Sequence, residues 1–185
     1  MQTDRIRDAV RELLTAIGEN PDRPELSQTP QKVAEAYASF FRGIGQDPHA
    51  ALSQTMPAQN TELVMLKDIE LVSICEHHLL PFTGFAHIAY LPSENIVGLG
   101  RLANLVEILS ARPQLQENLT NQIADAIEKA LTPKGVLVII EAKHQCVASR
   151  GARQPEVNTI TLASRGAYSD VAQRQEAMAL LSVSA

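Results

Sequence analysis

The stretch that decides the fold is Val136-Leu137-Val138-Ile139-Ile140, an unbroken apolar run rich in β-branched residues. Such a run, without helical spacing, is typical of a strand that is buried on both faces of a sheet. Pro133-Lys134-Gly135 breaks the pattern that precedes it, so we expect the strand to begin there. Downstream, Thr159 to Ser164 offers a last strand of the same sheet.

Two amphipathic helices precede the decisive strand. Apolar residues recur at helical spacing between Leu102 and Leu109 and again between Leu115 and Ala130. Pro113 separates the two stripes, because proline cannot continue a helix. We therefore expect two helices with a short junction.

Farther upstream, the sequence predicts a β-hairpin. Apolar residues gather between Leu63 and Ile74, and Gly84 to Leu91 forms a second candidate strand bounded by Pro81 and Pro92. The two strands are expected to pair antiparallel. The order ββααββ implies an α+β domain in which an antiparallel sheet is covered by a helical layer.

The N-terminal region reads as helical. Apolar residues between Ile6 and Ile17 share one helix face, and Thr29-Pro30 supplies the start of a second helix. The polar stretch 46–61 reads as a loop or weak structure. We therefore divide the chain into an N-terminal helical region, residues 1–60, and a ββααββ domain, residues 61–185, within a single compact chain of 185 residues.

Composition excludes several classes of protein. With 16 basic and 21 acidic residues the formal net charge is −5, which argues against general nucleic-acid binding and against a basic membrane-surface protein. No run approaches the roughly 20 apolar residues of a spanning helix, and the first residues lack the apolar stretch of a signal peptide. We expect a cytoplasmic protein with neither nucleic acid nor membrane as a partner.

Both cysteines of the chain stand beside histidines: Cys75 with His77 and His78, and Cys146 with His144. Residues two apart in an extended segment point the same way, so His144 and Cys146 are expected to face one site, and a tight turn can bring Cys75 and His78 together. A buried cysteine is often only a small hydrophobe, but two Cys/His clusters together favour a zinc site over a disulfide. The spacing leaves open whether the site is closed by four protein ligands or keeps a position for water.

Further motifs surround these clusters in a defined order. They are Cys75-Glu76-His77-His78-Leu79-Leu80-Pro81-Phe82, Tyr90-Leu91-Pro92, Gly98-Leu99, Gln114-Leu115-Gln116-Glu117-Asn118-Leu119-Thr120, Pro133-x-Gly135-Val136, Glu141-Ala142-x-His144-x-Cys146 and Arg150-Gly151. In their order and spacing they resemble the motifs of the GTP cyclohydrolase I family, from Thr29 to Gly166.

The resemblance implies a zinc ion held by Cys75, His78 and Cys146, with water as the fourth ligand. It leaves His77 and His144 as the catalytic proton-transfer groups. Opening the imidazole ring of a purine requires hydroxide at a poor electrophile, and zinc lowers the pKa of bound water towards neutrality. Histidine is the side chain that exchanges protons near physiological pH.

The resemblance also implies a substrate site. Glu117 matches the carboxylate that accepts hydrogen bonds from guanine, and Gln116 stands beside it. Arg101 and Arg150 match positions that bind the triphosphate. Without the resemblance, Glu117 is better interpreted as a solvated residue on an amphipathic helix, and the same caution applies to Gln116.

Several positions depart from the family pattern, among them Arg101, where lysine is more frequent, and the segment 153–158. Gly100 stands where serine is frequent, Asn104 where arginine is frequent, and Lys32 near a usual arginine. The expected function is zinc-dependent conversion of GTP and water to 7,8-dihydroneopterin triphosphate and formate, at the entry to tetrahydrofolate and pterin biosynthesis. The departures keep two alternatives open: a variant enzyme that uses another purine nucleotide or stops after ring opening, and a zinc-stabilised scaffold without turnover.

The family resemblance further implies the tunnelling fold, in which the sheets of several subunits join into a barrel. It implies a homodecamer of two pentameric rings with active sites between subunits. Such an assembly would cover the edges of the predicted sheet, which are otherwise open to unwanted pairing.

Overall fold

The computed structural model describes residues 1–181 and separates them into two compact units. The first is Met1–Arg42, and the second begins at Gly43. The predicted division of the chain into an N-terminal helical region, residues 1–60, and a ββααββ catalytic domain, residues 61–185, stays a prediction.

The N-terminal unit contains two helices, α1 (Thr3–Ala16) and α2 (Thr29–Phe40), which confirms both predicted helices. Gly18 follows α1 with a φ of 89°, a left-handed conformation that glycine adopts without strain and that commonly ends helices. Pro30 lies in the first turn of α2, where its missing N–H costs no hydrogen bond.

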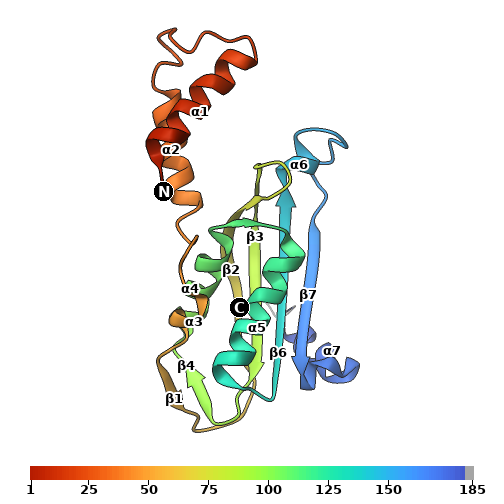
Figure 1. The fold of residues 1–185 in the computed structure, drawn as a ribbon. Helices are drawn as coiled ribbons and strands as arrows, with labels where there is room; N and C mark the ends of the chain where they lie inside the picture. Colours follow the sequence, from red (N-terminus) through yellow and green to blue (C-terminus); the bar gives the residue numbers. More distant parts are fainter. Residues whose placement is uncertain (182–185) are drawn as a thin grey trace. The chain divides into compact units, whose positions relative to one another are not determined.

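The second unit is built on a five-stranded sheet with the order β5-β2-β3-β6-β7, of which β2, β3, β6 and β7 are labelled in Figure 1. Its strands are β2 (Val64–Cys75), β3 (Pro81–Leu91), β5 (Pro113–Gln114), β6 (Gly135–His144) and β7 (Thr159–Gly166). The pairs β2–β3, β3–β6 and β6–β7 are antiparallel, which confirms the predicted hairpin and the α+β class. The sequence predicted four strands, and the short β5, parallel to β2, is a fifth.

The apolar run 136–140 lies in β6, between β3 and β7, and every residue from Gly135 to Ile140 is buried. Helices α4 (Leu99–Ser110) and α5 (Gln116–Leu131) cover one face of the sheet (Figure 1). Their apolar stripes pack against the sheet to form the core. Val136, Val138 and Ile140 pack in this core, and Leu137 and Ile139 are buried in a second cluster on the opposite face, so the run is enclosed on both sides, as its composition predicted.

The opposite face of the sheet is covered at one end by elements that the sequence analysis did not predict. These are the 3-10 turn η1 (Ala167–Ser169) and helix α7 (Val171–Leu181). Tyr168 and Ala177 pack there against Ala89, Leu137 and Ile139. The spacing of apolar residues in α7 is weak, which explains why periodicity did not reveal it.

Small elements occupy the stretch 46–61, which the sequence indicated as loop or weak structure. Helix α3 (Pro48–Ala51) has one turn, and β1 (Thr55–Pro57) pairs with β4 (Asn95–Val97) in a separate two-stranded sheet. Elements this short have too few residues to show a period. Their stability comes from tertiary pairing, and such short elements agree with the loop or weak structure that the sequence indicated.

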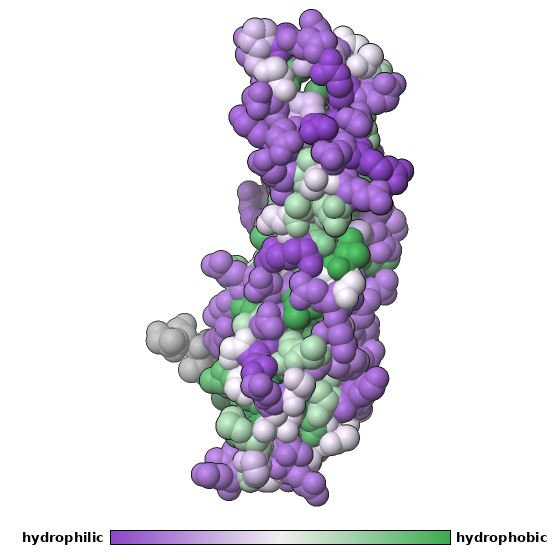
Figure 2. Space-filling view, turned by 60° about the vertical axis from the view of Figure 1, so that its left-hand side comes forward, coloured by the Kyte–Doolittle hydropathy of each residue, from purple (hydrophilic) through white to green (hydrophobic). Residues whose placement is uncertain are grey.

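Hydrophilic residues dominate the face of the molecule drawn in Figure 2, with apolar residues scattered between them. Within residues 1–181 no helix is both long and apolar enough to cross a membrane.

Candidate metal centre

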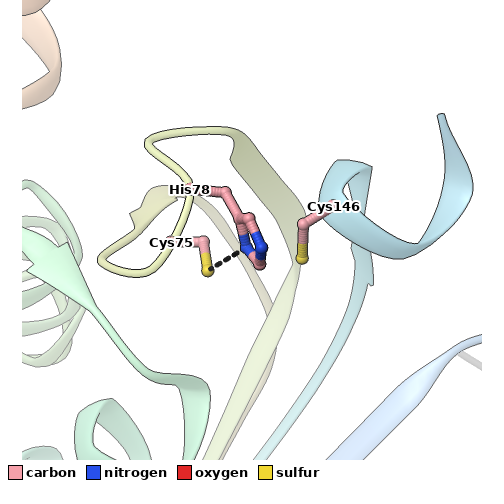
Figure 3. A group of neighbouring side chains, drawn as sticks. All are labelled: Cys75, His78 and Cys146. Atoms are coloured by element: carbon pink, nitrogen blue, oxygen red, sulfur yellow. Dashed lines mark hydrogen bonds between the residues drawn. The ribbon is translucent and has the colours of Figure 1, made fainter. Parts of the chain in front are cut away.

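Cys75 and His78 meet through the turn that joins β2 to β3. Cys75 ends β2, and its N–H donates to the carbonyl of Leu80 at 2.9 Å while its own carbonyl accepts from Leu79 N–H at 2.9 Å. Leu79 has a φ of 52°, so the chain reverses sharply here. His78 is turned back toward the strand end, and its Nδ1 lies 4.0 Å from Cys75 Sγ (Figure 3).

Cys146 reaches the same place from the segment that follows strand β6. Strand β6 ends at His144, and residues Gln145–Ala148 form a single helical turn, α6. The expectation that His144 and Cys146 share an extended segment was therefore wrong, because the backbone turns helical directly after His144. Cys146 nevertheless joins the cluster, and the ligand atoms of Cys75, His78 and Cys146 all lie within 4.8 Å of one another (Figure 3).

The donor set suits zinc. Two thiols and one imidazole are ligands that zinc prefers, and three protein ligands leave a fourth position for water or substrate. Burial raises the pKa of the Cys146 thiol, the neighbouring Cys75 raises it further, and Arg150 opposes the shift. Two close thiolates repel each other unless a cation lies between them, so this geometry fits a bound metal ion.

A cavity of about 240 Å³ opens beside the cluster. Cys75 and Cys146 lie on its wall, together with the other predicted site residues His77, His144, Gln116 and Glu117. The remaining lining residues are Gln114, Leu115, Val147 and Thr159. The fold thus brings both predicted proton-transfer histidines and the predicted guanine carboxylate to the metal cluster.

His144 is the most tightly held of these side chains. Its ring stacks on Phe82 with centroids 4.6 Å apart and planes 11° from parallel. Its Nε2 lies 2.7 Å from Gln116 Oε1. Burial lowers the pKa of His144, and the negative charge of Glu117 partly offsets this. His77, by contrast, is exposed, and its ring meets that of His78 edge-on.

Gln116 and Glu117 occupy the first turn of α5 but differ in exposure. Gln116 is only 2% exposed, and its amide is hydrogen-bonded within the protein. Glu117 is exposed, and within residues 1–181 it makes no ion pair. A carboxylate at a helix N-terminus is favoured by the helix dipole, so its negative charge is stable there.

The predicted triphosphate ligands do not line the cavity. Arg101, in α4, donates to the carbonyl of Ala51 at 3.3 Å and to Gln54 Oε1. Arg150 is exposed in the loop after α6, close enough for its charge to act on the Cys146 thiol. Within this chain the structure therefore groups Arg150, but not Arg101, with the metal cluster.

Three of the positions that depart from the family pattern, Gly100, Asn104 and Lys32, do not line the cavity. Gly100 and Asn104 are exposed on α4, and Lys32 is exposed on α2. A Cβ added at Gly100 would meet no atom within 4 Å, so the structure around it does not require glycine.

Sequence reasoning missed residues that shape the site without reactive side chains. Phe82, which stacks on His144, and Gln114 were quoted only as parts of motifs. Thr159 was named only as the start of a strand, and Val147 was not singled out. The pairing of Phe82 with His144 across β3 and β6 follows from strand register, which spacing along one chain does not give.

Comparison with known proteins agrees with this arrangement. The family described as GTP cyclohydrolase I matches residues 6–182. A protein named GTP cyclohydrolase 1 from Leifsonia xyli is 51% identical over 179 residues, which span 96% of this chain and 94% of the relative. A protein of the same name from Carboxydothermus hydrogenoformans is 52% identical over 180 residues, or 96% of this chain and 94% of the relative.

Among solved structures, an archaeosine synthase QueF-like protein in the apo form matches with a TM-score of 0.47 and 17% identity, covering 58% of this chain and 97% of that one. The family match and the two relatives span nearly the whole chain, including both halves of the metal cluster. The fold assembles the Cys-His-Cys cluster within the matched residues. Because the family match and the relatives cover nearly the whole chain, this chain belongs to the GTP cyclohydrolase I family.

Proposed function

We propose that the protein is a zinc-dependent GTP cyclohydrolase I, which converts GTP and water to 7,8-dihydroneopterin triphosphate and formate at the entry to tetrahydrofolate and pterin biosynthesis. One observation carries the proposal: the Cys75, His78 and Cys146 cluster opens onto the cavity that His77, His144 and Glu117 line. A structural zinc site would need none of the last three residues.

Cys75, His78 and Cys146 would hold the ion. A zinc ion with an open position supplies Lewis acidity and activates water near neutral pH, which is what hydrolysis of a purine imidazole ring requires. His77 and His144 lie on the same cavity and are the candidates for protonating ring nitrogen and for the later proton transfers of ribose rearrangement and pterin closure. His144 is rigidly held and His77 is exposed, so they differ in how freely they can follow the substrate.

Glu117 is the proposed guanine anchor. A carboxylate can accept from the ring N–H and the exocyclic amine of guanine at once. The side chain of Gln116 is occupied within the protein, so its proposed contribution to binding is through its main chain in the first turn of α5, where N–H groups lack intrahelical acceptors.

Arg101 and Arg150 are the proposed triphosphate ligands, and we propose that they act in a shared site of a homodecamer of two pentameric rings. Arg101 lies outside the cavity of its own chain, which is the expected arrangement if it serves the cavity of a neighbour. We also place the enzyme in the cytoplasm, where the two cysteine thiols stay reduced and available to a metal.

Gly100, Asn104 and Lys32 favour one alternative, a variant specificity at the phosphate end. Loss of a guanidinium removes a bidentate phosphate contact. That alternative keeps the same metal chemistry and differs only in the nucleotide used or in stopping after ring opening.

The test is incubation of zinc-loaded protein with GTP, with formate and the ultraviolet and fluorescence change of pterin formation measured together. Both products are expected in equal amounts. Formate without pterin would identify an enzyme that stops after ring opening. If neither GTP nor any other purine nucleotide yields formate, the protein is better explained as a zinc-stabilised scaffold without turnover.

The shared site is tested by subunit mixing. Arg101→Ala and His144→Ala should each be inactive, but hybrid oligomers assembled from both should regain part of the activity, because some sites then receive an intact residue from each chain. Absence of recovery in demonstrably mixed oligomers would contradict the shared site.

A further inference from the structure

A buried hydrogen-bond network surrounds His144 on the helix side of the sheet. Gln116 Oε1 lies 2.7 Å from His144 Nε2, and the same amide's Nε2 lies 3.0 Å from the carbonyl oxygens of both Ile140 and Thr159. Gln116 is 2% exposed, so water does not compete for these bonds.

These contacts fix which way the Gln116 amide points. Main-chain carbonyls only accept hydrogen bonds, so the atom that faces Ile140 and Thr159 must be the NH₂ group. The reversed amide would set its oxygen against two carbonyl oxygens. The atom that faces His144 is therefore Gln116 Oε1, which can only accept.

The protonation of His144 follows from this acceptor. A neutral imidazole carries one N–H, and the bond to Oε1 requires it on Nε2. Nδ1 then carries the lone pair, and within residues 1–181 it has no hydrogen-bond partner. Stacking on Phe82 fixes the plane of the ring.

Two threonines complete the network. Thr120 Oγ1 donates to the carbonyl of Gln116 at 2.7 Å, which uses the only hydroxyl proton of Thr120. In the 2.6 Å contact between Thr120 and Thr161 the donor must then be Thr161. The oxygen of Thr161 is left as a third acceptor for the Gln116 amide, at 3.1 Å. The two N–H groups of the Gln116 amide thus face three acceptors, so one N–H is shared between two of them.

We propose that Gln116, supported by Thr120 and Thr161, is a positioning residue that holds His144 in its Nε2–H tautomer and leaves Nδ1 as the nitrogen that exchanges protons with the substrate. The proposal rests on the proposed function for its catalytic consequence, but the tautomer itself is a property of the fold. It assigns the Gln116 side chain to His144, whereas a direct substrate contact would require part of the amide to be free.

The test compares Gln116→Leu with the parent protein, both zinc-loaded. Solid-state ¹⁵N NMR of histidine-labelled protein reports the tautomer, with the His144 signals identified by their loss in His144→Asn. The parent is expected to show a lone pair on Nδ1 only, and Gln116→Leu a mixture of tautomers. Loss of an orienting outer residue typically costs 10- to 100-fold, so kcat should fall by about that factor while KM for GTP changes less than about twofold.

A matched pair tests the hydroxyl. Thr161→Val should lower kcat in the same direction but less, since the two carbonyls still hold the amide, and Thr161→Ser should restore it. Equal zinc content and equal oligomer size in all variants exclude a folding defect.

Three results would overturn the proposal. A raised KM with unchanged kcat in Gln116→Leu would mean that the side chain binds substrate, and a single Nδ1 lone pair in that variant would mean that something else sets the tautomer. Thr161→Ser behaving like Thr161→Val would remove the threonine hydroxyl from the network. If the parent itself releases no formate from GTP, the proposed function fails, while the NMR comparison still decides the tautomer.

Discussion

Replacing Glu117 with glutamine tests the proposed guanine site with little risk to the fold. Glu117 is exposed in the first turn of α5 and makes no ion pair within residues 1–181. The substitution keeps the shape of the side chain and removes only its charge and one acceptor. Loss of the favourable interaction with the helix dipole should destabilise the fold by no more than about 0.3–1 kcal/mol.

The effect on catalysis should be much larger. Hydrogen bonds to a charged group contribute about 1.5–3 kcal/mol, and glutamine offers one acceptor and one donor where guanine presents two donors. Glu117→Gln therefore loses at least one charge-assisted bond. At 1.4 kcal/mol per factor of ten, kcat/KM for GTP should fall by about 10- to 150-fold.

The sharpest assay compares GTP with inosine triphosphate, which lacks the exocyclic amine of guanine. The parent should prefer GTP, and Glu117→Gln should lose most of that preference because the amine no longer has its carboxylate partner. Asn118→Ala is the matched control, since Asn118 is exposed on the same helical turn but does not line the cavity. An unchanged preference for GTP in Glu117→Gln, with zinc retained, would refute the placement of the guanine site.

Three further predictions concern the metal, proton transfer and the sheet. Cys146→Ser should lose tightly bound zinc, measured by metal analysis, because it removes one of three protein ligands; full occupancy in a folded variant would exclude Cys146 as a ligand. His77→Ala should keep zinc but lose formate release, and parallel loss of metal would mean that His77 is a ligand. Gly84→Ala should lower the thermal midpoint by about 6–12 °C, from roughly 3 kcal/mol of overpacking, because its Cβ would lie 1.9 Å from the carbonyl oxygen of Glu141. Gly98→Ala, with no atom within 4 Å of its Cβ, should melt like the parent.

The elements that could be predicted from sequence are those with a long, regular pattern. The helices that became α4 and α5 show several apolar residues at helical spacing, and the run in β6 leaves no solvent-facing side to its strand. Such patterns are set by burial, which acts on every residue of the element. Helix α6 has one turn and no period, so the residues around Cys146 were expected to be extended.

The sequence predicted the reactive side chains of the candidate site better than the residues that hold them in place. Cysteine and histidine are scarce in this chain, and their clustering pointed to a metal that the structure supports by bringing Cys75, His78 and Cys146 together. Glutamine and threonine are common residues whose side chains neither ionise nor act as typical metal ligands. Nothing in the sequence therefore distinguished Thr161 as part of a buried network. Their role depends on which strands are neighbours, and that is a property of the assembled sheet.

The shortest strand of the sheet links the metal cluster to the proposed guanine site. Strand β5 pairs Cys75 with Gln114, and Glu76 N–H donates to the carbonyl of Gln114 at 3.1 Å. Gln114 is itself anchored, because its buried amide donates to the carbonyl of Leu109 at 2.8 Å. Helix α5 begins two residues later, so the position of Glu117 is tied to the end of β2 through a few short bonds. A two-residue strand that no periodicity could reveal therefore sets the distance between the metal ligands and the carboxylate proposed to hold the base, and a change in that pairing should disturb both sites together.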